Sequence, residues 1–73
     1  MLKKCMTPIC GACKKIGKML DEMKVEYEDI DVSENPEFSA KYSITSVPTL
    51  LKDNGDKLVG IHTLSEIRSF LNS

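Results

Sequence analysis

The sequence lacks a net charge of any size and a long apolar run. With 10 Lys and Arg against 11 Asp and Glu, the formal net charge is -1 at pH 7, which provides no overall attraction for nucleic acid or an anionic membrane surface. No apolar run approaches the roughly 18 residues of a membrane-spanning helix, and Met1-Leu2-Lys3-Lys4 is far too short for a secretory signal. We therefore expect a cytoplasmic protein without a nucleic-acid or membrane partner.

The chain also has too few residues for a second domain and too few cysteines for a disulfide framework. Its 73 residues allow one small domain, which we place at 1–73. No internal repeat, linker or low-complexity segment divides it. Its three cysteines cannot all pair with one another, and in a reducing compartment such residues indicate redox or metal chemistry.

The most informative stretch contains Cys10 and Cys13. It follows a short run, 2–6, that is predicted to be a strand, since Pro8 favours extended backbone at Thr7. An amphipathic helical pattern then begins, which puts Cys10 near a helix N-terminus and Cys13 one turn further in, close enough for a small disulfide ring. Free backbone N–H groups there favour a thiolate. The spacing predicts thiol–disulfide exchange, with Cys10 attacking and Cys13 resolving.

The first half of the remaining chain predicts a helix, a strand and a second helix. Apolar residues recur at helical spacing from Cys10 to about Met23, and 25–32 fits a strand. Asn35 followed by proline is typical of a helix start, and Phe38 and Tyr42 form an i,i+4 apolar pair in the short helix that follows.

The second half predicts a hairpin and a last helix. Residues 49–52 and 57–61 flank Asn54-Gly55, which tolerates the positive φ angles of a tight hairpin. Thr63 and Glu66 have capping-box spacing ahead of a final amphipathic pattern. The predicted order is therefore βαβαββα, an α/β fold with a four-stranded mixed sheet whose first two strands are parallel.

Several cations and one further cysteine lie near the pair in the sequence. Cys5, on the first predicted strand, is most simply a small buried hydrophobic residue. Lys14, Lys15 and Lys18 indicate either a solvated helix face or a cationic rim that helps to hold Cys10 as a thiolate.

The motif order resembles the thioredoxin and glutaredoxin superfamily over essentially the whole chain. The matching stretches are Cys10-Gly11-Ala12-Cys13, Asp29-Ile30-Asp31, Asn35-Pro36, Lys41-Tyr42-Ser43-Ile44, Val47-Pro48-Thr49-Leu50, Asn54-Gly55 and Val59-Gly60. The resemblance implies a minimal thioredoxin fold with a redox-active disulfide between the first two cysteines. It also implies a cis Pro48 against that pair, a Val47 backbone that binds the substrate as an added strand would, and further substrate contacts at Ile9 and Gly60.

Three positions depart from the thioredoxin pattern. Ile9 replaces a tryptophan, Ala12 replaces a proline, and Lys4 stands where thioredoxins carry a buried acid that helps to deprotonate the resolving thiol. The Gly-Gly and acidic pair with which glutaredoxins hold glutathione are also missing, since residues 60–64 stand in their place. The length resembles that of miniature redoxins, which include glutaredoxin-like donors to ribonucleotide reductase.

We interpret the chain as a dithiol–disulfide oxidoreductase that reduces protein disulfides through Cys10 and Cys13. The missing glutathione-anchoring residues favour a flavoprotein thioredoxin reductase over glutathione as its reductant. The likeness to miniature redoxins suggests electron donation to ribonucleotide reductase or another thiol-dependent enzyme. We expect a monomer with no cofactor and no bound metal.

Two alternatives stay open at this point. In a metal module, Cys10 and Cys13, with Cys5 and His62, would hold zinc or share an iron–sulfur cluster. In a non-catalytic binding module, the same fold would use Val47-Pro48 to dock a partner.

Overall fold

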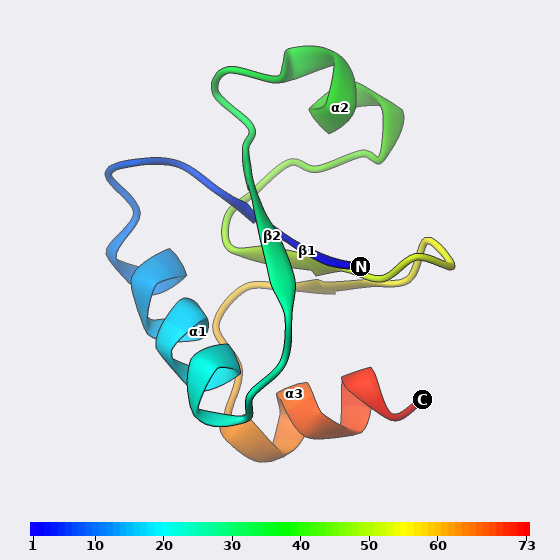
Figure 1. Ribbon diagram of the computed structural model, residues 1–73. Coiled ribbons are helices and arrows are strands. Elements are labelled where there is room, and N and C mark those ends of the chain that lie inside the picture. Colours follow the sequence, from blue (N-terminus) through cyan, green and yellow to red (C-terminus); the bar gives the residue numbers. More distant parts are fainter.

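Four strands form one mixed sheet in the computed structural model, which describes residues 1–73. The order across the sheet is β2-β1-β3-β4 (Figure 1). β1 pairs in parallel with β2 and antiparallel with β3, which in turn pairs antiparallel with β4. The strands are β1 (Leu2–Met6), β2 (Tyr27–Asp31), β3 (Thr49–Leu51) and β4 (Lys57–Val59).

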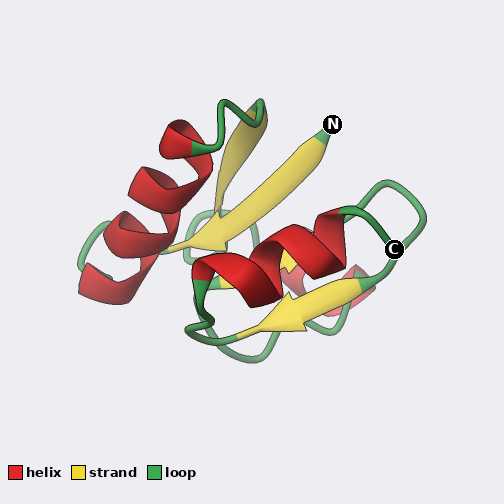
Figure 2. Ribbon diagram, turned by 90° about the horizontal axis from the view of Figure 1, so that it is seen from below, coloured by secondary structure: helices red, strands yellow, loops and turns green.

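Three helices complete the predicted βαβαββα order: α1 (Gly11–Glu22), α2 (Pro36–Lys41) and α3 (Leu64–Leu71). Figure 1 shows α1 and α3 on one side of the strands and α2 on the other, and Figure 2 shows α1 and α3 from their own side of the sheet. None of these helices has the length and apolar content to cross a membrane.

The hydrophobic core lies between the sheet and helices α1 and α3, which cover the same face of it. Ile16 and Leu20 of α1, Leu50 of β3 and Ile67 of α3 form one cluster in which no side chain is more than 2% exposed. Burial of apolar side chains is the main force that holds such layers together. This cluster fixes α1 against the sheet and thereby fixes the helix end that carries the cysteines.

Local signals begin the last helix and close the hairpin as predicted. The Thr63 hydroxyl accepts a hydrogen bond from the Glu66 backbone N–H at 3.2 Å, and the Glu66 carboxylate accepts one from the Thr63 N–H at 2.9 Å. This is the predicted capping box. Gly55 in the hairpin turn has φ +94°, which a residue without a Cβ adopts freely.

The segment around β2 and α2 differs from the prediction in two details. The second strand covers Tyr27–Asp31 and not the whole of 25–32. Asn35 precedes α2, but its side chain makes no capping hydrogen bond. Its amide nitrogen instead donates to the Asp31 carbonyl at 2.8 Å, because that group closes the turn after β2.

Candidate active site

Cys10 and Cys13 are joined by a disulfide at the start of α1, with their Cα atoms 5.2 Å apart. Cys10 is the N-cap residue of the helix and has extended backbone (φ -89°, ψ 104°). Its sulfur accepts a hydrogen bond from the Cys13 N–H at 3.1 Å. The sulfur thus satisfies one of the free N–H groups of the first turn, at the end of the helix where its dipole favours negative charge.

The two cysteines differ in their access to solvent. Cys13 is only 2% exposed, because it faces the sheet from the first turn of α1. Cys10 is partly exposed, and the neighbouring Ile9 is 96% exposed. Cys10 is therefore the more accessible of the two cysteines.

Lys4 contacts the backbone of the pair, and it is almost fully buried, at 6% exposure. It lies on β1 on the same face as Leu2 and Met6, since side chains alternate along a strand, and this face packs against α1. Its ammonium group donates to the Cys13 carbonyl at 3.3 Å and forms an ion pair with Asp29 at 3.0 Å.

Two residues that sequence reasoning missed make this arrangement possible. Asp29 lies directly opposite Lys4 in the parallel pairing of β1 and β2. Gly17 on α1 leaves room for the ammonium group, since a Cβ at this position would lie 2.8 Å from the Lys4 Nζ. Period-two alternation from Leu2 to Met6 could have predicted that Lys4 faces inwards, but no local signal points to Asp29.

The loop before β3 meets the end of β4 at the same end of the strands as the cysteines. The Val47–Pro48 peptide bond is cis, as the resemblance implied. Cys5 lies opposite Thr49 in the antiparallel pairing of β1 and β3, so Pro48 lies beside the carboxyl end of β1, from which the chain continues to Cys10. The Gly60 N–H donates to the Pro48 carbonyl at 2.8 Å.

The backbone of Val47 makes no hydrogen bond within the protein. Neither its N–H nor its carbonyl is among the backbone pairs outside the helices and strands, and no side chain bonds to it. The residue is partly exposed. It therefore offers one free donor and one free acceptor at the end of the sheet where β3 begins.

Cys5 and His62 lie apart from this chemistry. Cys5 is a free thiol with 0% exposure, and burial raises its pKa, an effect that Lys3 partly opposes. The His62 Nε2 lies 2.7 Å from the Val59 carbonyl, which can only accept, and this bond raises the pKa of the imidazole. The structure gathers no group of three or more His, Cys, Asp or Glu side chains that could hold a metal ion.

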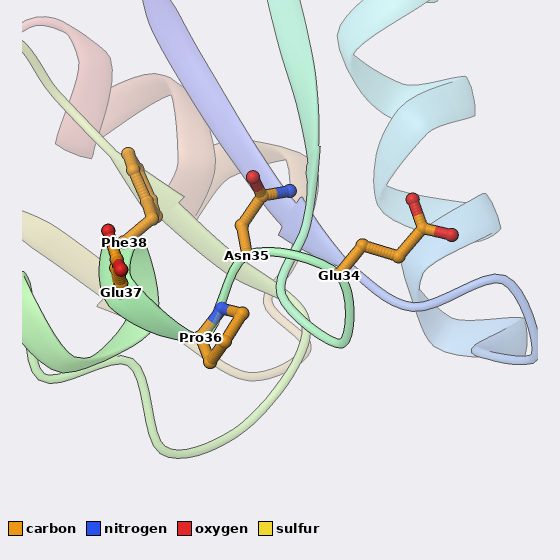
Figure 3. Close-up of a pocket in the computed structure, with 5 residues that line it drawn as sticks. All are labelled: Glu34, Asn35, Pro36, Glu37 and Phe38. Carbon is orange, nitrogen blue, oxygen red and sulfur yellow. The ribbon is translucent and has the colours of Figure 1, made fainter.

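A surface hollow of about 380 Å³ lies at the start of α2 (Figure 3). Its lining, 34–38, includes the carboxylates of Glu34 and Glu37 and contains none of the predicted site residues.

The three lysines of α1 that could form a cationic rim, Lys14, Lys15 and Lys18, are exposed. The buried cation beside the pair is Lys4.

Comparison with known proteins gives one consistent family. The family model described as Thioredoxin matches residues 1–73. Thioredoxins from Staphylococcus aureus, among them those of strains Mu50 and USA300, are 38% identical over 73 residues, and the match covers 86% of this chain and 70% of theirs.

Two solved structures share the fold. A mutant of the thioredoxin-like protein BC3987 superposes with a TM-score of 0.80 at 24% identity, covering 99% of this chain and 100% of that one. A mutant thioredoxin from Halobacterium salinarum NRC-1 gives a TM-score of 0.82 at 22% identity, covering 97% of this chain and 70% of that one.

Proposed function

The chain belongs to the thioredoxin family and is a thiol–disulfide oxidoreductase, and we propose that Cys10 attacks protein disulfides and Cys13 resolves the resulting complex. The observation that carries this assignment is the difference in access, since Cys10 is partly exposed at the helix cap and Cys13 is 2% exposed. The first thiol must reach a disulfide on another protein. The second needs to reach only Cys10.

The exchange proceeds in two steps. The Cys10 thiolate attacks one sulfur of the substrate disulfide, so a mixed disulfide forms and the other substrate sulfur leaves as a thiolate that takes up a proton. Cys13 then loses its proton and attacks the Cys10 sulfur. The Cys10–Cys13 disulfide forms, the second substrate thiol is released, and two electrons have passed to the substrate.

Substrate binding in this proposal uses Ile9, Val47, Pro48 and Gly60. The free N–H and carbonyl of Val47 suit an extended substrate segment that pairs as an added strand. Ile9, at 96% exposure, offers an apolar contact next to Cys10. The hydrogen bond between Gly60 and Pro48 fixes the loop that carries Val47.

A reductase must return two electrons to the disulfide after each turnover. We infer that this partner is a flavoprotein thioredoxin reductase and not glutathione, because the residues with which glutaredoxins anchor glutathione are missing from 60–64. There, His62 bonds to Val59 and Thr63 caps α3. Turnover with NADPH and thioredoxin reductase should exceed turnover with glutathione, and equal or faster turnover with glutathione would place the protein in the glutaredoxin branch.

The wider setting is also part of the proposal. We infer a monomeric cytoplasmic protein that works as one domain over 1–73 and donates electrons to ribonucleotide reductase or another thiol-dependent enzyme. Reconstitution with purified ribonucleotide reductase, with the reduced protein as the sole dithiol, tests the donor role. Absence of deoxynucleotide formation under these conditions would exclude this substrate.

The test of the cysteine roles is trapping of the mixed disulfide. In a Cys5→Ala background, Cys13→Ser should accumulate a covalent complex with a disulfide-containing model protein, visible on a non-reducing gel and by mass spectrometry. Cys10→Ser, the matched control with one thiol at the other position, should accumulate none. Trapping by Cys10→Ser alone would reverse the assignment.

A further inference from the structure

We propose that the ion pair between buried Lys4 and exposed Asp29 sets the reactivity of the inner thiol, Cys13, with Lys4 as a positioning cation. This inference rests on the proposed function, in which Cys13 resolves the mixed disulfide. It assigns a role to a buried charged residue that the exchange chemistry itself leaves unused.

The geometry places the cation on the backbone of the resolving residue. The Lys4 Nζ lies 3.3 Å from the carbonyl oxygen of Cys13 and 3.0 Å from a carboxylate oxygen of Asp29. It also lies 5.2 Å from the centre of the Tyr27 ring. Because Gly17 has no side chain, α1 can approach β1 closely enough for these contacts.

The electric field of this cluster at Cys13 is net positive. The Lys4 side chain is 8% exposed, whereas that of Asp29 is 53% exposed, so water screens the carboxylate much more than the ammonium group. Burial, with Asp21 and Asp29 nearby, raises the pKa of Tyr27, whose hydroxyl therefore stays neutral. From β3, the residue opposite Lys4 is the uncharged Leu50.

A positive field favours the step that Cys13 has to perform. A thiolate at a site that is 2% exposed loses most of its hydration, which works against deprotonation. A nearby cation offsets that loss and raises the fraction of Cys13 present as the attacking thiolate. The proton leaves to solvent, and Lys4 forms and breaks no bond.

The first experiment titrates Cys13 alone. In a Cys5→Ala, Cys10→Ser background Cys13 is the only thiol, so the rate of its alkylation against pH reports this residue alone. Lys4→Met should move the midpoint up by about one pH unit, which lowers the thiolate fraction about tenfold below the midpoint. Lys3→Met is the matched control, since it removes the same charge from the opposite face of β1 and should leave the midpoint unchanged.

The partner residue supplies a test of opposite sign. Asp29→Asn keeps an acceptor for the ammonium group but removes the negative charge, so the midpoint should move down. Gly17→Ala places a Cβ 2.8 Å from the present Nζ position and displaces the cation at constant charge, so the midpoint should rise by less than in Lys4→Met. A purely structural role would not shift the Lys4 and Asp29 variants in opposite directions.

A kinetic measurement completes the test in the chain with both cysteines of the pair. Release of substrate from the preformed mixed disulfide should be about tenfold slower in Lys4→Met at neutral pH, as the thiolate fraction requires. A Lys4→Met midpoint equal to that of the background, or shifts of the same sign in both charge variants, would overturn the inference. Failure of the wild-type protein to reduce any protein disulfide would instead refute the proposed function.

Discussion

The unequal burial of Lys4 and Asp29 predicts an asymmetric effect of their removal on stability. Removal of Lys4 leaves the Asp29 carboxylate, which water already reaches because its side chain is 53% exposed. Removal of Asp29 leaves an ammonium group on a side chain that is 8% exposed. Its one remaining hydrogen bond, to the Cys13 carbonyl, is 3.3 Å long. Lys4→Met should therefore be tolerated, whereas Asp29→Ala should be clearly destabilising.

The size of the difference follows from the two environments. An uncompensated buried charge costs about 3 to 5 kcal/mol, and partial access of water at Asp29 favours the lower end, about 3 kcal/mol for Asp29→Ala. Lys4→Met replaces the buried stem with an apolar chain and leaves a solvated acid, so its free energy of unfolding should change by less than about 1 kcal/mol. The gap of about 2 kcal/mol corresponds to roughly 8 to 16 °C in Tm for a domain of this size.

Chemical denaturation of the oxidised proteins, followed by circular dichroism, measures both values. Lys3→Met serves as the control for loss of a lysine elsewhere on β1. A loss of stability in Lys4→Met as large as that in Asp29→Ala would show that the pair itself, and not the unpaired ammonium, determines the cost. The reasoning from unequal burial would then be wrong.

Three further outcomes are expected. Because burial raises the pKa of Cys5, alkylation of the reduced folded protein should modify it far more slowly than Cys10, as peptide mass spectrometry would show. Thr63→Ala removes the hydroxyl that accepts from the Glu66 N–H and should cost about 1 kcal/mol in urea denaturation, while Thr63→Ser should cost less. The raised pKa of folded His62, mainly from its bond to the Val59 carbonyl, adds stability that is fully present below the unfolded pKa of about 6.5. That stability is lost as pH rises through the folded pKa, so the urea midpoint should fall between about pH 6 and pH 8, and this fall should be absent in His62→Gln.

Local signals in the sequence were enough to predict the elements and the cysteine pair. Helix starts, the hairpin turn and the spacing of Cys10 and Cys13 depend on residues within about one helical turn of one another. The structure confirms the capping box at Thr63, the hairpin at Gly55 and the disulfide at the start of α1. The burial of Cys5, expected of a small hydrophobic residue on the first strand, is confirmed at 0% exposure.

Competition between local hydrogen bonds limited this kind of prediction. The Asn35 side chain was expected to cap α2, yet it donates to the Asp31 carbonyl and closes the preceding turn. Asparagine can serve a cap or a turn equally well. Only the path of the chain after β2 decided between the two uses.

Tertiary structure alone decided which groups surround the Lys4 ammonium. The sequence showed a lysine where the family has an acid, and a lysine on a strand usually lies in solvent. The parallel register puts Asp29 opposite it, and α1 packs closely enough, through Gly17, to cover the ammonium group and place the Cys13 carbonyl beside it. Register and helix approach depend on contacts between residues far apart in the chain, so no local pattern specifies which charge lies beneath Cys13.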